Sequence, residues 1–201
     1  PSVNLGVGEA AGLPPHVTGE DFLKLYDIAP GSPGAYALTS DDYVALARTY
    51  GRMGGMDRVA TVIERIRAER GAGNTLLLDG GDTWQGSYTA NETRGADMVE
   101  AVNLLGTDVL TGHWEFTYGE ARLRANLKQF KGEFVAQNVF LTEEAAFNDK
   151  PAFDAASGRV FKPYTVKEVG GHRIAVIGQA FPYVPIAHPR RFVPDWTFGI
   201  R

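Results

Sequence analysis

The sequence predicts an α/β fold in which parallel strands alternate with helices. The first observation is that short apolar segments ending in glycine are separated by segments whose apolar residues recur at helical spacing. This alternation is typical of parallel βαβ units. The second observation is a later pair of apolar segments, at residues 164–177, which indicates a β-hairpin. Parallel sheets bind ligands beyond the carboxyl ends of their strands, so we look for a functional site there.

The composition is that of a folded domain, and it disfavours several classes of partner and metal ligand. The 201 residues are 44% hydrophobic and 22% charged, which is enough for one domain with a core. The net charge is −4 and the basic residues are scattered, which disfavours nucleic acid as a partner. No apolar run approaches the roughly 20 residues of a spanning helix, so we expect no membrane insertion. The chain has no cysteine, and a metal site would therefore use His, Asp, Glu or Asn side chains.

Residues 1–40 predict an irregular N-terminal arm. Gly and Pro are frequent there, as in GEAAGLPPH and IAPGSPGAY, and they flank one short apolar stretch. From residue 41 the pattern becomes helical, and residues 41–201 are interpreted as the main domain. The chain begins at Pro1 without an initiator Met and ends at Arg201 without a polar tail. We therefore expect it to be an excerpt of a longer protein.

The elements expected after residue 40 are helices with apolar residues three or four apart and strands that are short apolar runs. The predicted helices cover residues 43–50, 59–66, 98–105 and 120–130. The predicted strands cover residues 75–82, 108–113 and 133–137, followed by the two arms of the hairpin at 164–177. The hairpin turns at Gly170 and Gly171. The proline-rich segment 181–194 predicts a rigid loop.

Two consecutive predicted strands end in glycine followed by a side chain that can bind metal. LLLDGGD places Asp82 just past the first strand, and VLTGH places His113 just past the second. Adjacent parallel strands bring their tips to neighbouring positions, and the glycines allow sharp turns that let both side chains converge. A carboxylate and an imidazole suit Mn²⁺, Fe²⁺ or Zn²⁺. Such a metal would activate water for attack on an electrophilic centre.

Each of these residues also has a purely structural interpretation. Gly-Asp-Thr is common turn chemistry, so Asp82 can be a cap or turn residue. His113 can be a half-buried histidine bonded to a backbone carbonyl, and Trp114 can be a core residue. Glu115 can be a solvated or hydrogen-bonded carboxylate with no ligand role. Spacing alone leaves both interpretations open.

Four longer motifs carry a resemblance to a known family. GGDTWQGS and TGHWEFTYG, followed by AQNV at residues 136–139 and by IGQAFPYVPIAHP, resemble the SoxB family of sulfur oxidation and, more distantly, the 5′-nucleotidases. The resemblance extends over essentially the whole chain. It implies that residues 41–201 are part of an incomplete four-layer α-β-β-α metallophosphoesterase catalytic domain, periplasmic and holding two Mn²⁺ ions or other divalent metals. The family's Asp-x-His motif is expected before Pro1. A further His, the Gly-His-Thr-His motif and a separate C-terminal domain are expected after Arg201.

The resemblance also implies roles for individual residues. Asp82 would bridge the two metals, and His113 would be a ligand where nucleotidases have the Asn of Gly-Asn-His-Glu. Trp114 stands where nucleotidases have the histidine that protonates the leaving group. A sulfur leaving group has less need of this acid. Thiols have pKa values of about 8.5 or below, so a persulfide is already stable as an anion when it leaves. If this loop is aligned with the nucleotidase motif in a different register, His113 is itself the acid, and the loop supplies no metal ligand.

The implied substrate is a cysteine S-thiosulfonate on a SoxY-like carrier protein, from which sulfate is released. A 5′-nucleotidase or other phosphoesterase is the enzymatic alternative, and a non-catalytic binding module is the third hypothesis. We expect the 201-residue chain alone to have little or no activity. Asp82 and His113 cannot hold two metals by themselves.

Two more residues are candidates for the site. Arg52, in YGRMGG, can bind an anionic sulfonate through its guanidinium, although a helix-end arginine is more often a surface charge. Asn138 follows a predicted strand and can orient a ligand or substrate, although such a residue often bonds only to backbone. The remaining histidines are interpreted as structural or solvent-exposed, namely His16, His172 and His188.

Overall fold

A computed structural model describes residues 18–51 and 53–199. The chain divides into two compact units, Pro1–Arg58 and Val59–Arg201. The first unit thus extends beyond residue 40, where the sequence pattern changes, and the assignment of a catalytic domain to residues 41–201 stays a prediction. Arg52 and His16 lie outside the described residues.

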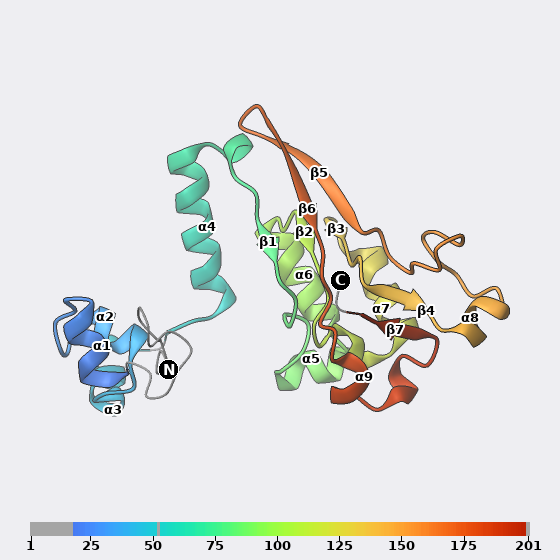
Figure 1. Cartoon of the computed structure of the whole chain (residues 1–201). Helices are drawn as coiled ribbons and strands as arrows, with labels where there is room; N and C mark the ends of the chain where they lie inside the picture. Colours follow the sequence, from blue (N-terminus) through green and yellow to red (C-terminus); the bar gives the residue numbers. More distant parts are fainter. Residues whose placement is uncertain (1–17, 52, 200–201) are drawn as a thin grey trace. The chain divides into compact units, whose positions relative to one another are not determined.

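The described part of the first unit consists of short helices (Figure 1). They are α1 (Gly19–Leu25), α2 (Pro33–Leu38) and α3 (Tyr43–Tyr50). The helix predicted at residues 43–50 is therefore confirmed, whereas the irregular arm expected for residues 1–40 is wrong where α1 and α2 occur. The described glycines and prolines in this region lie at or near the ends of helices and do not prevent helix formation. In α2, Pro33 occupies the start of the helix and the Ser32 hydroxyl accepts a hydrogen bond from the Ala35 N–H at 3.2 Å.

Two tyrosine hydroxyls link these helices to glycine turns. Tyr36 donates to the Gly51 carbonyl and Tyr50 donates to the Gly31 carbonyl, each at 2.8 Å. A small apolar cluster lies between α1 and α2, made of Phe22, Leu23, Ala35 and the partly buried Ile28. These contacts give the short helices the tertiary support that their length does not provide.

From residue 56 onward, helices alternate with short strands, as the sequence predicts (Figure 1). The α-helices are α4 (Met56–Arg70), α5 (Tyr88–Thr93), α6 (Ala96–Leu105), α7 (Glu120–Gln129), α8 (Glu143–Phe147) and α9 (Val184–Ala187). The strands are β1 (Leu78–Asp79), β2 (Val109–Leu110), β3 (Glu133–Phe134), β4 (Val139–Leu141), β5 (Tyr164–Val169), β6 (His172–Ile177) and β7 (Trp196–Phe198). Short 3₁₀ turns are η2 (Ala72–Asn74), η3 (Glu115–Tyr118) and η4 (Arg190–Phe192).

A parallel sheet of three strands positions the candidate site. Its order is β1-β2-β3, with Leu78 beside Val109 and Leu110 beside Phe134. Helices α5 and α6 connect β1 to β2, and α7 connects β2 to β3. The chain therefore forms two successive βαβ units. The carboxyl ends of β1 and β2 lie side by side, which confirms the expected placement of the loops that carry Asp82 and His113.

The predicted hairpin is also present. β5 and β6 pair antiparallel from Tyr164 with Ile177 to Val169 with His172. Gly170 and Gly171 have φ angles of 57° and 78°, as a type I′ hairpin turn requires.

The segment predicted as a rigid loop, residues 181–194, contains the short helix α9 and the turn η4. Beyond it, β7 pairs antiparallel with β4. The sequence did not predict this pair, because strands of three residues are too short to show an alternating pattern.

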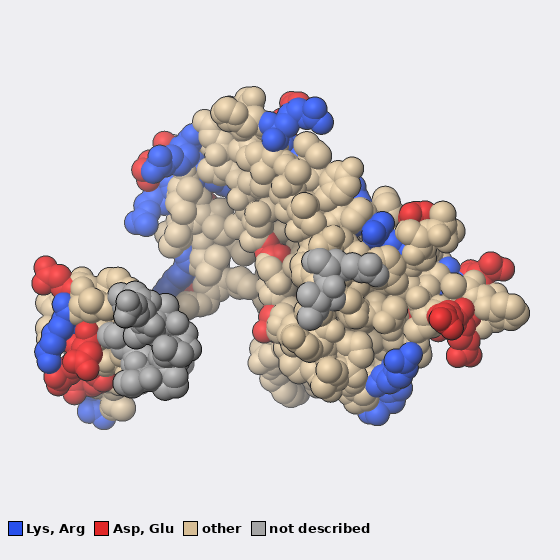
Figure 2. All heavy atoms as spheres, in the orientation of Figure 1, with Lys and Arg blue, Asp and Glu red and all other residues tan. Residues whose placement is uncertain are grey.

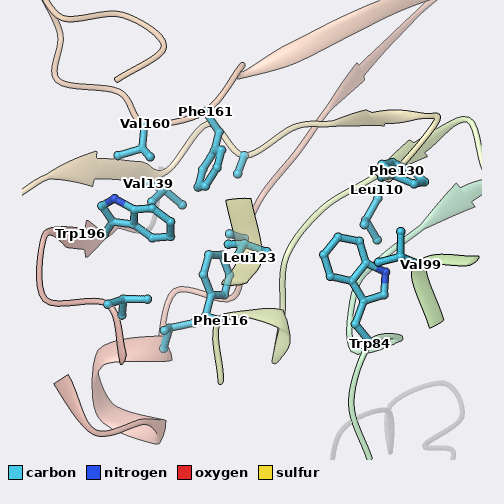
Figure 3. Close-up of a cluster of buried hydrophobic side chains, with 14 of the residues drawn as sticks. Trp84, Val99, Leu110, Phe116, Leu123, Phe130, Val139, Val160, Phe161 and Trp196 are labelled. Atoms are coloured by element: carbon cyan, nitrogen blue, oxygen red, sulfur yellow. The ribbon is translucent and has the colours of Figure 1, made fainter. Parts of the chain in front are cut away.

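The core of the second unit is built on large aromatic residues (Figure 3). Trp196 makes edge contacts with Phe116 and Phe161, with ring centroids 6.2 and 5.1 Å apart. Trp84 is fully buried near Phe130, at 6.4 Å between rings. Burial of each such side chain contributes about 1.5–3 kcal/mol before the entropic cost of ordering it. The core fixes η3 and the segment after Asp82, both of which lead into the site.

Charged side chains are dispersed on the face shown in Figure 2, with wide uncharged areas between the Lys, Arg, Asp and Glu residues. Among the described helices, none combines the length and the apolar character that crossing a membrane demands.

Candidate functional site

The loop after β1 is held by the last residue of that strand. Oδ1 of Asp79 accepts hydrogen bonds from the Gly81 N–H and from the Thr83 hydroxyl, both at 2.9 Å. Within this turn Asp82 has a φ of 68°, in the left-handed region that Asp tolerates better than most residues. The Gln85 amide donates to Oδ1 of Asp82 at 2.7 Å. These bonds fix the direction of the Asp82 carboxylate.

Burial raises the pKa of the Asp79 carboxyl above its usual value. The hydrogen bonds from Gly81 and Thr83 act in the opposite direction, and the negative charge of Glu115 adds to the rise. Asp79 therefore binds a proton more tightly in the folded chain than in the unfolded chain.

The loop after β2 packs directly against the first loop. The Thr111 N–H donates to the Asp79 carbonyl at 3.1 Å, which continues the pairing of the two strands. A Cβ atom at Gly81 would lie 2.8 Å from the His113 backbone nitrogen and 2.9 Å from the Thr111 carbonyl oxygen. There is no room for a side chain at this position, so the glycine is what allows the two loops to meet.

Glu115 joins the two loops from inside. Its side chain is fully buried, with 0% exposure. Oε1 accepts from the backbone N–H groups of Thr83 and Trp84 at 2.8 and 3.3 Å, and Oε2 accepts from the His113 N–H at 2.6 Å. The interpretation of Glu115 as a hydrogen-bonded carboxylate is thereby confirmed. It belongs to the site as the link between the two loops.

These contacts bring Asp82 and His113 together, as the sequence predicts. Oδ2 of Asp82 lies 3.9 Å from Nδ1 of His113, which is too long for a hydrogen bond. Nδ1 is buried and has no hydrogen-bond partner within the described residues. A buried imidazole nitrogen without a partner is costly, and a divalent cation shared with the facing carboxylate would satisfy it.

The pair is only part of a ligand set. Among residues 18–51 and 53–199, no group of three or more His, Cys, Asp or Glu side chains is arranged to hold a metal. The side chains of His113 and Asp82 retain 34% and 49% exposure. Both are therefore open to further ligands or substrate on their accessible sides.

Aromatic rings surround His113 on another side. The Phe181 ring stacks on the His113 imidazole at 4.3 Å between centroids and 30° between planes. The Trp114 indole lies 6.5 Å from Phe181 and 6.2 Å from His113. Phe181 was not among the predicted site residues. A usable signal was Gly178, which follows β6 much as glycines follow the ends of β1 and β2.

His188 packs against the predicted site residue Trp114. The two rings make an edge contact at 4.3 Å and 70°, and His188 is only 5% exposed. Its Nδ1 lies 3.4 Å from the Thr117 hydroxyl, and its Nε2 is buried without a partner among the described residues. Burial, with a smaller contribution from His113, lowers the pKa of His188. His188 is thus a buried residue beside Trp114, whereas His172 is exposed at the start of β6.

Asn138 is fully buried and bonds to backbone groups of two later segments. Its amide nitrogen donates to the carbonyls of Ala180 and Gly199, and its oxygen accepts from the Ala180 N–H, all at 2.8 Å. These bonds use both amide hydrogens. The predicted contact of Asn138 with substrate stays a prediction, and its observed contacts are those of an anchor for Ala180.

Comparison with known proteins identifies relatives of the chain. No protein-family profile matches it. It is similar to the sulfate thiohydrolase SoxB of Thermus thermophilus, with a TM-score of 0.79 and 36% identity over 92% of this chain and 32% of that one. It is also similar to a 5′-nucleotidase precursor of Thermus thermophilus, with a TM-score of 0.57 and 30% identity over 73% of this chain and 26% of that one.

Curated relatives point in the same direction. The 5′-nucleotidase of Rattus norvegicus is 30% identical over 149 residues, which cover 73% of this chain and 24% of the relative. The chain spans about a quarter of the length of the curated relatives it matches. The expected fold class, part of an α/β metallophosphoesterase domain, is confirmed by these structural matches.

Proposed function

Because the chain belongs to the metallophosphoesterase superfamily of SoxB and the 5′-nucleotidases, we propose that it contributes Asp82 and His113 to the metal centre of a hydrolase. The observation that carries this proposal is the 3.9 Å approach of Oδ2 of Asp82 to a buried Nδ1 that has no hydrogen-bond partner among the described residues. Glu115 and Gly81 hold the two backbones in contact, so the pair is preorganised.

The proposed centre would hold two divalent ions, with Mn²⁺ as the leading choice. Asp82 would be a ligand shared by both ions and His113 a ligand of one, and the remaining ligands would come from other parts of the full-length protein. A carboxylate and an imidazole without thiolate fit Mn²⁺, Fe²⁺ or Zn²⁺. Bound ions of this kind supply Lewis-acid activation of water and neutralise an anionic substrate.

The proposed substrate is a cysteine S-thiosulfonate on a SoxY-like carrier protein in the periplasm. Water adds its oxygen to the terminal sulfonate sulfur, the S–S bond breaks, and the bonding electrons leave with the persulfide. Sulfate is released and two protons pass to solvent. Trp114 supports this substrate, because an indole cannot act as a general acid and a persulfide anion does not require one.

The other predicted contacts complete this proposal. Trp114 would line the substrate pocket beside His113, where the rings of Phe181 and His188 fix the indole. Arg52 would bind the sulfonate, and it lies outside the described residues.

A 5′-nucleotidase is the second candidate, favoured by the curated relatives. An alkoxide is a poor leaving group, and a general acid accelerates its expulsion by roughly 10²–10⁴-fold. This candidate therefore needs an acid other than Trp114. In the alternative register, His113 would serve as that acid and would not bind metal.

Parallel assays of the full-length protein separate the two candidates. We expect sulfate release from the carrier conjugate and nucleotide hydrolysis that is slower by about 10²-fold or more. Trp114→His should raise nucleotide hydrolysis by restoring an acid, whereas the control Trp114→Phe should not. Brisk nucleotide turnover without sulfate release would contradict the thiosulfonate proposal and favour the nucleotidase.

A further inference from the structure

The ring that stacks on His113 belongs to a segment far away in the sequence. Phe181 follows β6, and its ring lies 4.3 Å from the His113 imidazole at 30°. Its backbone N–H also donates to the Gly112 carbonyl at 2.9 Å. Phe181 therefore contacts the histidine loop through both its backbone and its side chain, and the ring is partly buried.

The segment that carries Phe181 is fixed at a second point. Both backbone groups of Ala180 bond to the buried Asn138 side chain at 2.8 Å. Two residues earlier, a Cβ atom at Gly178 would collide with the Val135 carbonyl oxygen, so the backbone passes too close to the residue after β3 for any other side chain. The Phe181 ring is thus held on a rigid support.

The His113 ring lacks the usual means of orientation. A metal-binding histidine normally donates its second ring N–H to a carboxylate or carbonyl, which fixes the plane of the ring. Nδ1, which faces Asp82 at 3.9 Å, is the nitrogen that would bind the metal, so Nε2 is the second ring nitrogen. Within the described residues, no hydrogen bond is found at Nε2 of His113 either. Stacking on Phe181 restricts rotation of the imidazole in place of that hydrogen bond.

We propose that Phe181 is a positioning residue that holds the His113 imidazole in the orientation needed to bind metal. The inference rests on the proposed function, because it assumes that His113 is a ligand. Phe181 itself touches neither metal nor substrate in this account. Its role is to reduce the rotational freedom that His113 would lose on binding the ion.

The test is a Mn²⁺ titration of the metal-free full-length protein and its variants. Phe181→Leu keeps an apolar side chain but removes the ring, and should weaken Mn²⁺ binding by about 10–100-fold. Phe181→Tyr keeps the ring, and its affinity for Mn²⁺ should be within about threefold of the wild-type affinity. Ile186→Ala is the matched control, because Ile186 lies on the same segment with 83% exposure. It should bind like the wild type.

Thermal unfolding of the metal-free variants separates positioning from folding. Positioning requires that Phe181→Leu and Phe181→Tyr have similar metal-free stability but different Mn²⁺ affinity. Equal affinity of Phe181→Leu and wild type would overturn the inference, as would a loss in Phe181→Tyr as large as in Phe181→Leu.

The variant Asp82→Ala distinguishes failure of this inference from failure of the proposed function. If Asp82→Ala loses Mn²⁺ while Phe181→Leu keeps it, the metal centre stands and the positioning role is wrong. If neither variant changes Mn²⁺ binding, the proposed metal centre is itself wrong.

Discussion

The two loops that meet at the site are stabilised in different ways. The loop after β1 is held mainly by the strand-end residue Asp79, which bonds to Gly81 and Thr83. Glu115 of the second loop adds bonds to the Thr83 and Trp84 N–H groups. The loop after β2 depends on groups outside it, because the Phe181 ring covers His113 and His188 packs on Trp114. A loop supported from a distance ties its ligand to the rest of the fold.

The largest effect is expected where the two loops share a single group. Glu115→Ala leaves the N–H groups of Thr83, Trp84 and His113 without their buried acceptor. Each unsatisfied group costs about 1–3 kcal/mol, so the free energy of unfolding should fall by about 3 kcal/mol or more. Denaturant unfolding followed by tryptophan fluorescence measures the change. Glu115→Gln keeps one acceptor oxygen and should lose less, and equal losses would argue against the proposed link.

A medium effect is expected where the loops touch without a side chain. Gly81 and Gly86 have φ angles of 87° and 107°, so alanine at either position carries backbone strain of about 1–3 kcal/mol. Only at Gly81 would the new Cβ meet the His113 backbone, at 2.8 Å, whereas nothing lies within 4 Å at Gly86. Gly81→Ala should therefore destabilise the chain more than Gly86→Ala in the same unfolding assay. Equal effects would mean that the loops can separate at no cost.

The same contrast explains what the sequence could predict. The parallel strands, the hairpin turn and the approach of Asp82 to His113 follow from local signals, namely glycine placement and apolar runs. Phe181 and His188 were not assigned to the site, because their contacts depend on how the segment after β6 crosses the strand ends, and Gly178 was the one local signal of that crossing. Asn138 had two open interpretations for the same reason. Its bonds to Ala180 and Gly199 join segments that are more than 40 residues away.

The smallest effect is expected within the locally bonded loop, as a change in pH dependence. The folded-state pKa of Asp79 is raised above its usual value of 3.8, so its contribution to stability is greatest below the unfolded pKa and is lost as pH rises through the folded pKa. Asp79→Asn keeps an acceptor oxygen for Gly81 and Thr83 but has no such proton. Urea unfolding between about pH 3 and pH 7 should show wild-type stability declining relative to the variant as pH rises. Parallel curves would contradict the assignment.

Metal content is the most direct test of the claim that Asp82 and His113 form a metal centre. Element analysis of the full-length protein should show that Asp82→Ala loses about one metal equivalent or more, because a bridging carboxylate holds both ions. Asp149→Ala is the matched control, since Asp149 is also an aspartate with positive φ, at 51°, and it should retain the wild-type metal content. Unchanged metal content in Asp82→Ala would contradict the account and leave the chain as a non-catalytic binding module.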